Sequence, residues 1–284
     1  MRRLGAALGA VLLAAGPALA AQTMRSYAAG GPSANPPAVL RTVLEFGAGR
    51  VVVRAGTGPS LYDAQLRYDA DRFTPVHRYE PRTGALRLGL ESVGRAGIRV
   101  TSRSQLEQVA RFELSPRVPL ELEASLGASE ALLDLGGLTL QRLAVRAGAT
   151  RGTIDFSTPT RGTCREFALA LGAGELLALR LANAGCELVR IEGGVGRALL
   201  DLGGTWRRDL RVESKLSMGS LVVRIPRGTG VEVTAQKFLS RFAMEGLTRD
   251  GDAWRTAGFA QAERKVTLDL QANVAGFEIE WIDR

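Results

Sequence analysis

Apolar and polar residues alternate along nearly every segment from Arg41 to the C-terminus. This period of two is typical of β-strands, whose side chains point alternately to two faces. Glycines interrupt the alternation in steps of 21, 24, 22 and 25 residues, at Gly127, Gly148, Gly172, Gly194 and Gly219. A weaker turn follows near residues 273–276. The pattern predicts strand-corner-strand repeats of about 22 residues.

Two of these repeats share seven identical residues. Both 131–137 and 198–204 read Ala-Leu-Leu-Asp-Leu-Gly-Gly, and they lie 67 residues apart, or about three repeats. No single repeat can bury its apolar side alone, so stacking the repeats would build one continuous core, which is the logic of a solenoid. Small aliphatic residues should face that core: Leu120, Leu122, Leu126, Leu133, Leu135, Leu169, Leu171, Leu176, Ala198, Leu200, Leu202, Leu221, Val223 and Ile225.

The two cysteines bear on the choice between a stack and a meander of antiparallel hairpins, which would show the same alternation. Cys164 and Cys186 each precede a corner glycine by eight residues. Equivalent positions in stacked repeats lie about 4.8 Å apart, which a disulfide accepts, whereas in a meander they lie about twice as far apart. We therefore expect a Cys164–Cys186 disulfide in an all-β fold, a parallel β-solenoid like a single-chain right-handed β-helix. Two buried free thiols are the alternative.

The N-terminus has the pattern of an export signal. Arg2 and Arg3 precede an apolar run over residues 4–15, and Ala18-Leu19-Ala20 fits a cleavage site. We expect a signal peptide over 1–20 and a flexible linker over 21–40, which is rich in Gly and Pro. A first, irregular strand is the alternative for the second segment. The remaining 41–284 would form one β-solenoid domain, with an N-terminal part over 41–115 and a repeat part over 116–284. No later apolar run is long enough to predict a transmembrane segment in the mature chain.

Composition narrows the chemistry. The chain has 284 residues, with one histidine and two cysteines, which excludes His-rich metal sites, zinc ribbons and iron–sulfur clusters. Its 37 basic and 29 acidic residues give +8, and loss of Arg2 and Arg3 with the signal leaves 35 against 29, or +6. All basic residues except three lysines are arginine. A gene of high GC content favours arginine codons, so this composition is as well explained by coding as by binding to an anionic partner.

Candidate catalytic residues are few. Asp134 and Asp201 hold equivalent places three repeats apart, roughly 14 Å at the strand spacing, which exceeds the ~5–9.5 Å of glycosidase carboxylate pairs. We expect both to be solvated or to cap strand ends. His77 stands among charged residues and is expected to be a surface histidine. Nucleophile-elbow, zincin and phosphate-loop motifs are missing, so we predict no catalytic residues, no cofactor and no metal.

Two groups of residues suit anion or sugar binding. Trp206 stands beside Arg207 and Arg208, and a second group combines arginine with tyrosine at Tyr68, Arg72, Arg78 and Tyr79. Solvated strand faces and edge gatekeepers are the alternative. The partner we expect is an anionic envelope polymer, such as lipopolysaccharide phosphates or wall carboxylates, or another envelope protein. Nucleic acid does not suit an exported chain.

Several motifs resemble a known family. Residues 117–145, with Val-Pro-Leu-Glu-Leu, Leu-Gly-Ala and Leu-Asp-Leu-Gly-Gly-Leu, are similar to bacterial toast-rack domains. Those domains are in turn similar to putative adhesin domains and to the extracytoplasmic part of cell-wall-active antibiotic response proteins. The segment from Phe46 to Tyr79 and the C-terminal strands after Trp254 also fit, so the resemblance covers roughly 41–284. It implies a β-solenoid envelope domain without established enzymatic activity.

The function we expect is an exported, non-catalytic interaction or scaffold module of the cell envelope, periplasmic or extracellular. A carbohydrate-active β-helix enzyme and an accessory sensor of envelope stress are the alternatives. A clustered acid pair in a groove would favour the enzyme, and an Arg and aromatic face would favour binding. The pattern predicts no particular oligomeric state.

Overall fold

The described residues form one long, mostly parallel sheet. The computed structural model describes residues 23–32, 34–93, 107–237 and 241–283, so the signal peptide expected over 1–20 lies outside the described residues. Sixteen strands follow the order β1-β3-β6-β2-β7-β8-β9-β10-β11-β16-β12-β15-β14 within this part, with β5 on β2, β4 on β5 and β13 on β16. The fold is therefore all-β, as predicted.

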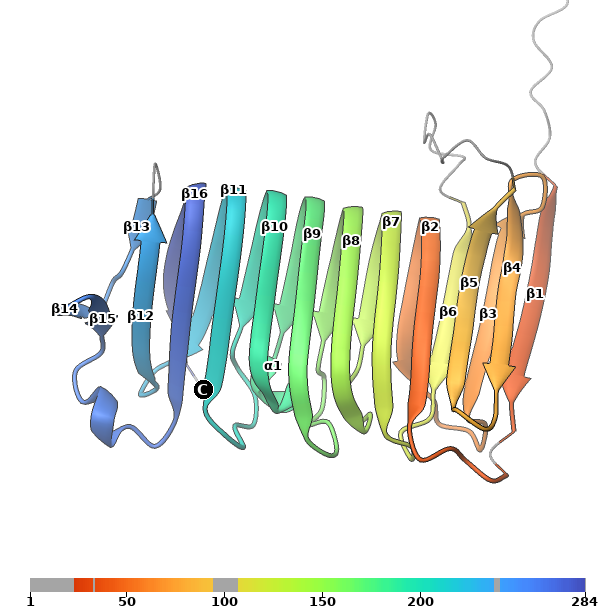
Figure 1. Cartoon of the computed structure of the whole chain (residues 1–284), viewed down its shortest axis with the longest axis horizontal. Coiled ribbons are helices and arrows are strands. Elements are labelled where there is room, and N and C mark those ends of the chain that lie inside the picture. Colours follow the sequence, from red (N-terminus) through yellow and green to blue (C-terminus); the bar gives the residue numbers. More distant parts are fainter. Residues whose placement is uncertain (1–22, 33, 94–106, 238–240, 284) are drawn as a thin grey trace, which may run out of the picture.

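Seven strands of 15 to 18 residues form a parallel ladder along the middle of the molecule (Figure 1). They are β2 (Leu40–Ala55), β7 (Leu120–Asp134), β8 (Leu140–Asp155), β9 (Cys164–Leu179), β10 (Cys186–Asp201), β11 (Leu210–Pro226) and β16 (Lys265–Ile282). Pairing between β2 and β7 runs from Leu40–Leu120 to Arg54–Asp134. The parts expected over 41–115 and 116–284 thus share one sheet.

Shorter elements occupy the two ends of the ladder. At the N-terminal end lie β1 (Met24–Gly31), β3 (Tyr62–Asp69), β4 (Phe73–Glu80), β5 (Ala85–Ser92) and β6 (Val109–Leu114). At the C-terminal end lie β12 (Gly230–Lys237), β13 (Arg241–Ala243), β14 (Thr248–Asp250), β15 (Ala253–Arg255) and the 3-10 helix η2 (Phe259–Gln261). A single short helix, α1 (Leu181–Ala184), connects β9 to β10.

Each ladder strand bends near its middle, so that its two halves form two layers (Figure 1). In β7 the buried side chains occupy even positions up to Leu126 and odd positions from Ser129 onward. The change of phase at Gly127 keeps both halves facing the space between the layers. All fourteen residues predicted to face the core are buried there.

The glycine corners have a steric reason. A Cβ added at Gly127 would lie 2.1 Å from the carbonyl oxygen of Gly47 on the neighbouring strand. Gly148, Gly172 and Gly194 continue the same row, each facing the glycine before it. Gly219 does not belong to this row, because its register partner is Gly196. The predicted step from Gly194 to Gly219 is therefore wrong by two residues.

The predicted disulfide is present. Cys164 and Cys186 are register partners on β9 and β10, with Cα atoms 4.2 Å apart, and they form a disulfide. Both side chains are buried in the core. The parallel register that the cysteines were expected to report is the register observed.

The prediction of a flexible linker over 21–40 is wrong for β1. This strand pairs antiparallel with β3, from Met24–Asp69 to Gly31–Tyr62. Its residues show no clear alternation because the strand lies at the end of the sheet, where one side chain, Tyr27, packs against the core. Backbone pairing with β3, which the local sequence does not record, makes this segment a strand.

No helix in the described residues is long and apolar enough to cross a membrane.

Candidate functional site

The first predicted binding group is occupied by contacts within the chain. Arg207 Nη2 donates to Thr160 Oγ1 at 3.1 Å, and Nη1 donates to the carbonyl oxygen of Gly162 at 3.4 Å. Arg208 pairs with Glu187, and Trp206 packs partly against the core. These side chains fasten the connectors between strands and do not form a shared open surface.

The second predicted group is not brought together. Tyr68 points inward and is only 8% exposed, while Arg72 lies 3.6 Å from the carboxylate of Asp69. On β4, Arg78 is exposed on the face opposite Tyr79. Tyr79 packs edge-on against Tyr62 at 5.5 Å between ring centroids. Alternation along β4 thus separates Tyr79 from Arg78, and the inward direction of Tyr68 keeps its ring from joining the exposed arginines.

His77 is not the surface residue we expected. Its Nδ1 is hydrogen-bonded to the hydroxyl of Tyr27 at 3.0 Å, and its Nε2 to the hydroxyl of Tyr62 at 2.7 Å. The ring links β4 to β1 and β3, so it joins the two layers at the N-terminal end. Burial raises the pKa of Tyr62, and the neighbouring Tyr79 and Tyr27 raise it further. With both ring nitrogens in use, His77 has a structural role.

Asp134 and Asp201 cap strand ends, as predicted. Gly136 N–H donates to Asp134 at 3.1 Å, and Gly203 N–H donates to Asp201 at 2.7 Å. The Asp-Leu-Gly sequence therefore forms the same side-chain-capped turn at both places. Each carboxylate therefore has a structural partner within its own turn.

Arginine and glutamate pair across neighbouring strands on the outer faces. Arg50 contacts Glu130 at 3.1 Å between β2 and β7, and Arg190 lies between Glu166 and Glu213 on the strands to either side. Parallel register repeats such pairs at the strand spacing along the sheet. Many arginines on the outer faces are thereby paired with acids of the same chain.

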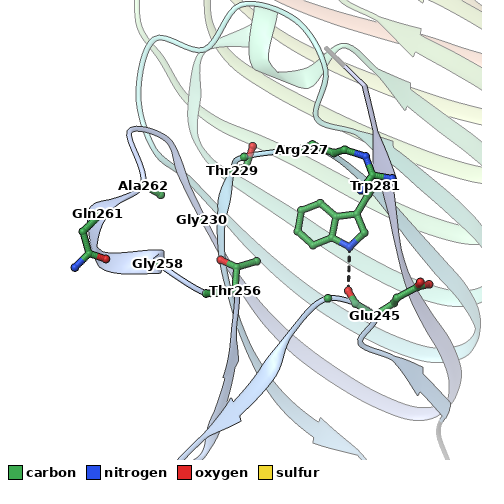
Figure 2. A pocket seen from close by; sticks show the side chains of 12 residues that line it. Arg227, Thr229, Gly230, Glu245, Thr256, Gly258, Gln261, Ala262 and Trp281 are labelled. Atoms are coloured by element: carbon green, nitrogen blue, oxygen red, sulfur yellow. Dashed lines mark hydrogen bonds between the residues drawn. The ribbon is translucent and has the colours of Figure 1, made fainter.

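A cleft of about 600 Å³ lies at the C-terminal end of the sheet (Figure 2). The side chain of Trp281, on β16, stands across it from the segment that leads through η2, and the start of β12 lies between them. The residues that shape it most directly are Arg227, Thr229, Gly230, Thr256, Gly258 and Trp281.

Local sequence holds the indole in this position. Trp281 Nε1–H donates to the carbonyl oxygen of Glu245 at 2.9 Å. Gly246 has φ +80°, and a Cβ there would lie 2.9 Å from the same nitrogen. A glycine therefore lets the backbone of the 244–247 turn approach the ring edge. The Glu245 carboxylate points away from the cleft (Figure 2).

The polar groups of the cleft have distinct characters. Thr229 is buried, and Thr256 Oγ1 accepts a hydrogen bond from Val231 N–H at 2.9 Å. Arg227 is 69% exposed, and its nearest acid, Asp283, lies 3.5 Å away and is 96% exposed. Such an exposed ion pair is weak. The cleft thus combines an aromatic ring, hydroxyls and an arginine whose side chain is largely exposed.

Sequence reasoning missed this cleft. Arg227, Gly258 and Trp281 lie in three separate segments, and the cleft forms only where β11 ends, β12 begins and β16 ends. A possible signal was the concentration of two of the three tryptophans, Trp254 and Trp281, in the last 31 residues. Trp254 packs partly against the core at this end of the sheet.

Part of the chain matches a known family model. None of the curated proteins matches the chain. Among solved structures, a putative cell adhesion protein from Clostridium sporogenes is 15% identical, with a TM-score of 0.48, and the match covers 91% of this chain and 100% of that one. A putative adhesin from Bacteroides fragilis is 11% identical, with a TM-score of 0.43, covering 92% of this chain and 98% of that one. Residues 37–165 match the family model described as the N-terminal domain of toast_rack. Over residues 37–165, the chain is therefore similar to the toast-rack N-terminal domain.

Proposed function

We propose that this protein is an exported, non-catalytic interaction module of the cell envelope that binds an anionic saccharide in the Trp281 cleft. The observation that carries the proposal is the placement of Trp281 and the exposed guanidinium of Arg227 on one cleft of about 600 Å³. Clefts of this size that bring a few polar groups together around an aromatic ring are the usual form of ligand sites.

The two side chains suit a charged sugar for different reasons. An indole offers a flat apolar surface on which the C–H face of a sugar ring can pack. A guanidinium binds a carboxylate or phosphate through two parallel hydrogen bonds. Since Asp283 holds Arg227 only by an exposed contact at 3.5 Å, the acidic group of a ligand can replace it at little cost.

The frame fits such a role. We propose that the parallel ladder is a right-handed solenoid of about 22 residues per turn, spanning 41–284, to which β1 adds a strand. The buried contacts between side chains of neighbouring ladder strands would keep the cleft rigid. The Cys164–Cys186 disulfide, which is stable in an oxidising compartment, would add to this rigidity. Rigid scaffolds lower the entropy lost when a ligand binds.

Export is tested by the mass of the protein recovered from the host's envelope or medium. Cleavage after Ala20 predicts a chain that begins at Ala21. A chain that stays in the cytoplasm and retains Met1–Ala20 would contradict the export part of the proposal without bearing on the cleft.

Calorimetric titration with an oligosaccharide that carries uronic acids, and with its neutral counterpart, tests the cleft. Trp281→Leu and Trp281→Phe both lose the hydrogen bond to Glu245, but only the leucine variant lacks a ring. We expect the leucine variant to bind roughly five- to tenfold more weakly than the phenylalanine variant. Arg227→Gln should weaken binding of the acidic sugar alone, whereas Arg78→Gln, at the other end of the sheet, should change nothing.

Two results would count against the proposal. Equal affinity of all four variants would place the ligand elsewhere. Cleavage of the oligosaccharide during the titration, detected by mass, would support the alternative of a carbohydrate-active enzyme.

A further inference from the structure

Three large apolar side chains stand exposed in one row at the bend of the C-terminal ladder strands. Val195 on β10 is the register partner of Met218 on β11, and Met218 is the register partner of Val274 on β16. Their exposed fractions are 54%, 52% and 49%. Neighbouring strands lie about 4.8 Å apart, so the three side chains form a continuous apolar ridge, which we call the Met218 ridge.

The fold does not require large residues at this position. In the four preceding ladder strands the same row holds alanine, at Ala48, Ala128, Ala149 and Ala173. The bend can therefore form with alanine at this position. The three larger side chains point outward at the corner and add little to the core, and a cluster of exposed apolar residues of this kind marks an interaction site.

The charges around the ridge are mostly positive. Within three positions of Val195, Met218 and Val274, the ladder strands carry Arg197, Lys215 and one acid, Glu192. Arg197 is 67% exposed, and a second acid, its register partner Glu175 on β9, lies 4.0 Å from it. Exposed Arg241, on β13, adds a third cation beside Gly276 of β16. Protruding aliphatic side chains flanked by cations match the headgroup and acyl regions of an anionic bilayer.

We propose that the Met218 ridge inserts into the surface of an anionic lipid bilayer. A ridge, unlike a groove, encloses no small ligand, but it can place its side chains below lipid headgroups. Because each strand bends at its middle, the ridge lies at the edge opposite the strand ends that form the Trp281 cleft (Figure 1). A bilayer on the ridge would leave the cleft facing away from the membrane, so the inference goes beyond saccharide binding and does not depend on it.

Vesicle flotation tests the proposal. The protein is prepared as residues 21–284, because the apolar N-terminal segment would itself bind lipid. Vesicles contain either equal parts of phosphatidylglycerol and phosphatidylcholine or phosphatidylcholine alone. We expect binding to the anionic vesicles at low salt, weaker binding at high salt, and little binding to phosphatidylcholine alone.

The matched variants are the triple change Val195→Ser, Met218→Ser and Val274→Ser, and the single change Leu132→Ser. Leu132 is also 49% exposed but lies on an outer sheet face away from the bend. The triple variant should bind anionic vesicles at least about tenfold more weakly, and the Leu132 variant should bind like the original protein. If the triple variant does not fold, the single variant Met218→Ser replaces it, and we then expect a smaller loss of vesicle binding.

Equal vesicle binding by the original protein and the folded ridge variants would overturn the inference, as would no binding to anionic vesicles at low salt. The titration with oligosaccharide is run on the same triple variant. Retained sugar binding with lost vesicle binding would separate the ridge from the cleft, and a failed sugar titration leaves the vesicle result unaffected.

Discussion

The hydroxyl of Tyr62 lies 2.7 Å from Nε2 of His77, and this hydrogen bond joins the two layers of the sheet at its N-terminal end. Tyr62 is 2% exposed. In either neutral tautomer, one ring nitrogen donates to a tyrosine oxygen and the other accepts from a tyrosine hydroxyl, so Tyr27 and Tyr62 satisfy both. The pair closes the end of the core.

Replacing Tyr62 by phenylalanine should therefore destabilise the fold by about 1–3 kcal/mol, because the half-buried Nε2 of His77 loses its partner. Tyr79→Phe is the matched control, since it keeps the ring contact with Tyr62 and removes no hydrogen bond to His77. Urea unfolding measures both variants. A Tyr62→Phe midpoint equal to that of Tyr79→Phe would show that the hydrogen bond does not contribute.

The same tyrosine predicts a loss of stability at alkaline pH. Burial raises the pKa of Tyr62 in the folded protein, and Tyr79 and Tyr27 add to this shift. The unfolded chain releases this proton near pH ~10, so the stabilisation is complete below that pH and falls as the pH rises towards the folded pKa. Unfolding midpoints measured across this range should decline less steeply in Tyr62→Phe. Equal slopes would contradict the assignment.

The disulfide should contribute about 3 kcal/mol, the value expected when a bond closes a loop of this size, given that Cys164 and Cys186 are 22 residues apart. Reduction should lower the unfolding midpoint of the original protein. The double variant Cys164→Ala and Cys186→Ala should show the lowered midpoint already and should not respond to a reductant. Alkylation of both thiols in the native, unreduced protein would contradict the bond.

Gly219 should be among the residues least tolerant of substitution. Its φ is +129°, and an added Cβ would lie 1.9 Å from the carbonyl oxygen of Gly196 on the neighbouring strand. Gly219→Ala should cost at least about 2 kcal/mol, because both backbone strain and a steric clash result. Gly58, with nothing within 4 Å of its added Cβ, is the control. Similar melting temperatures for the two alanine variants would show that the corner is not tightly packed.

The ladder could be predicted from the sequence because the residue patterns that determine it are short and recur from repeat to repeat. Alternation selects the inward side chains, and the positions of Cys164 and Cys186 before two corner glycines record the parallel register. The echo between 131–137 and 198–204 also follows this register, since Ala131 reaches Ala198 through Gly152 and Leu176. Only the corner at Gly219 was misplaced, because a second glycine row runs two residues further on.

The ends and the site could not be predicted in this way, because they depend on contacts between distant segments. β1 is a strand only through its pairing with β3, and His77 is half-buried only because β1 and β3 bring two tyrosines to it. From the sequence, the Arg207 guanidinium was expected to bind a ligand. In the structure it donates a hydrogen bond to Thr160 in a connector between strands. Trp281 faces a cleft whose other wall begins more than 20 residues earlier.

The most direct test of the Trp281 cleft is the indole N–H spectrum of the protein during titration with the acidic oligosaccharide. The chain has three tryptophans, which give three resolvable signals, and Trp281→Phe assigns one of them. We predict that the Trp281 signal shifts with ligand while those of Trp206 and Trp254 stay in place. A stationary Trp281 signal at saturating ligand, or a shift of Trp206 instead, would contradict the account.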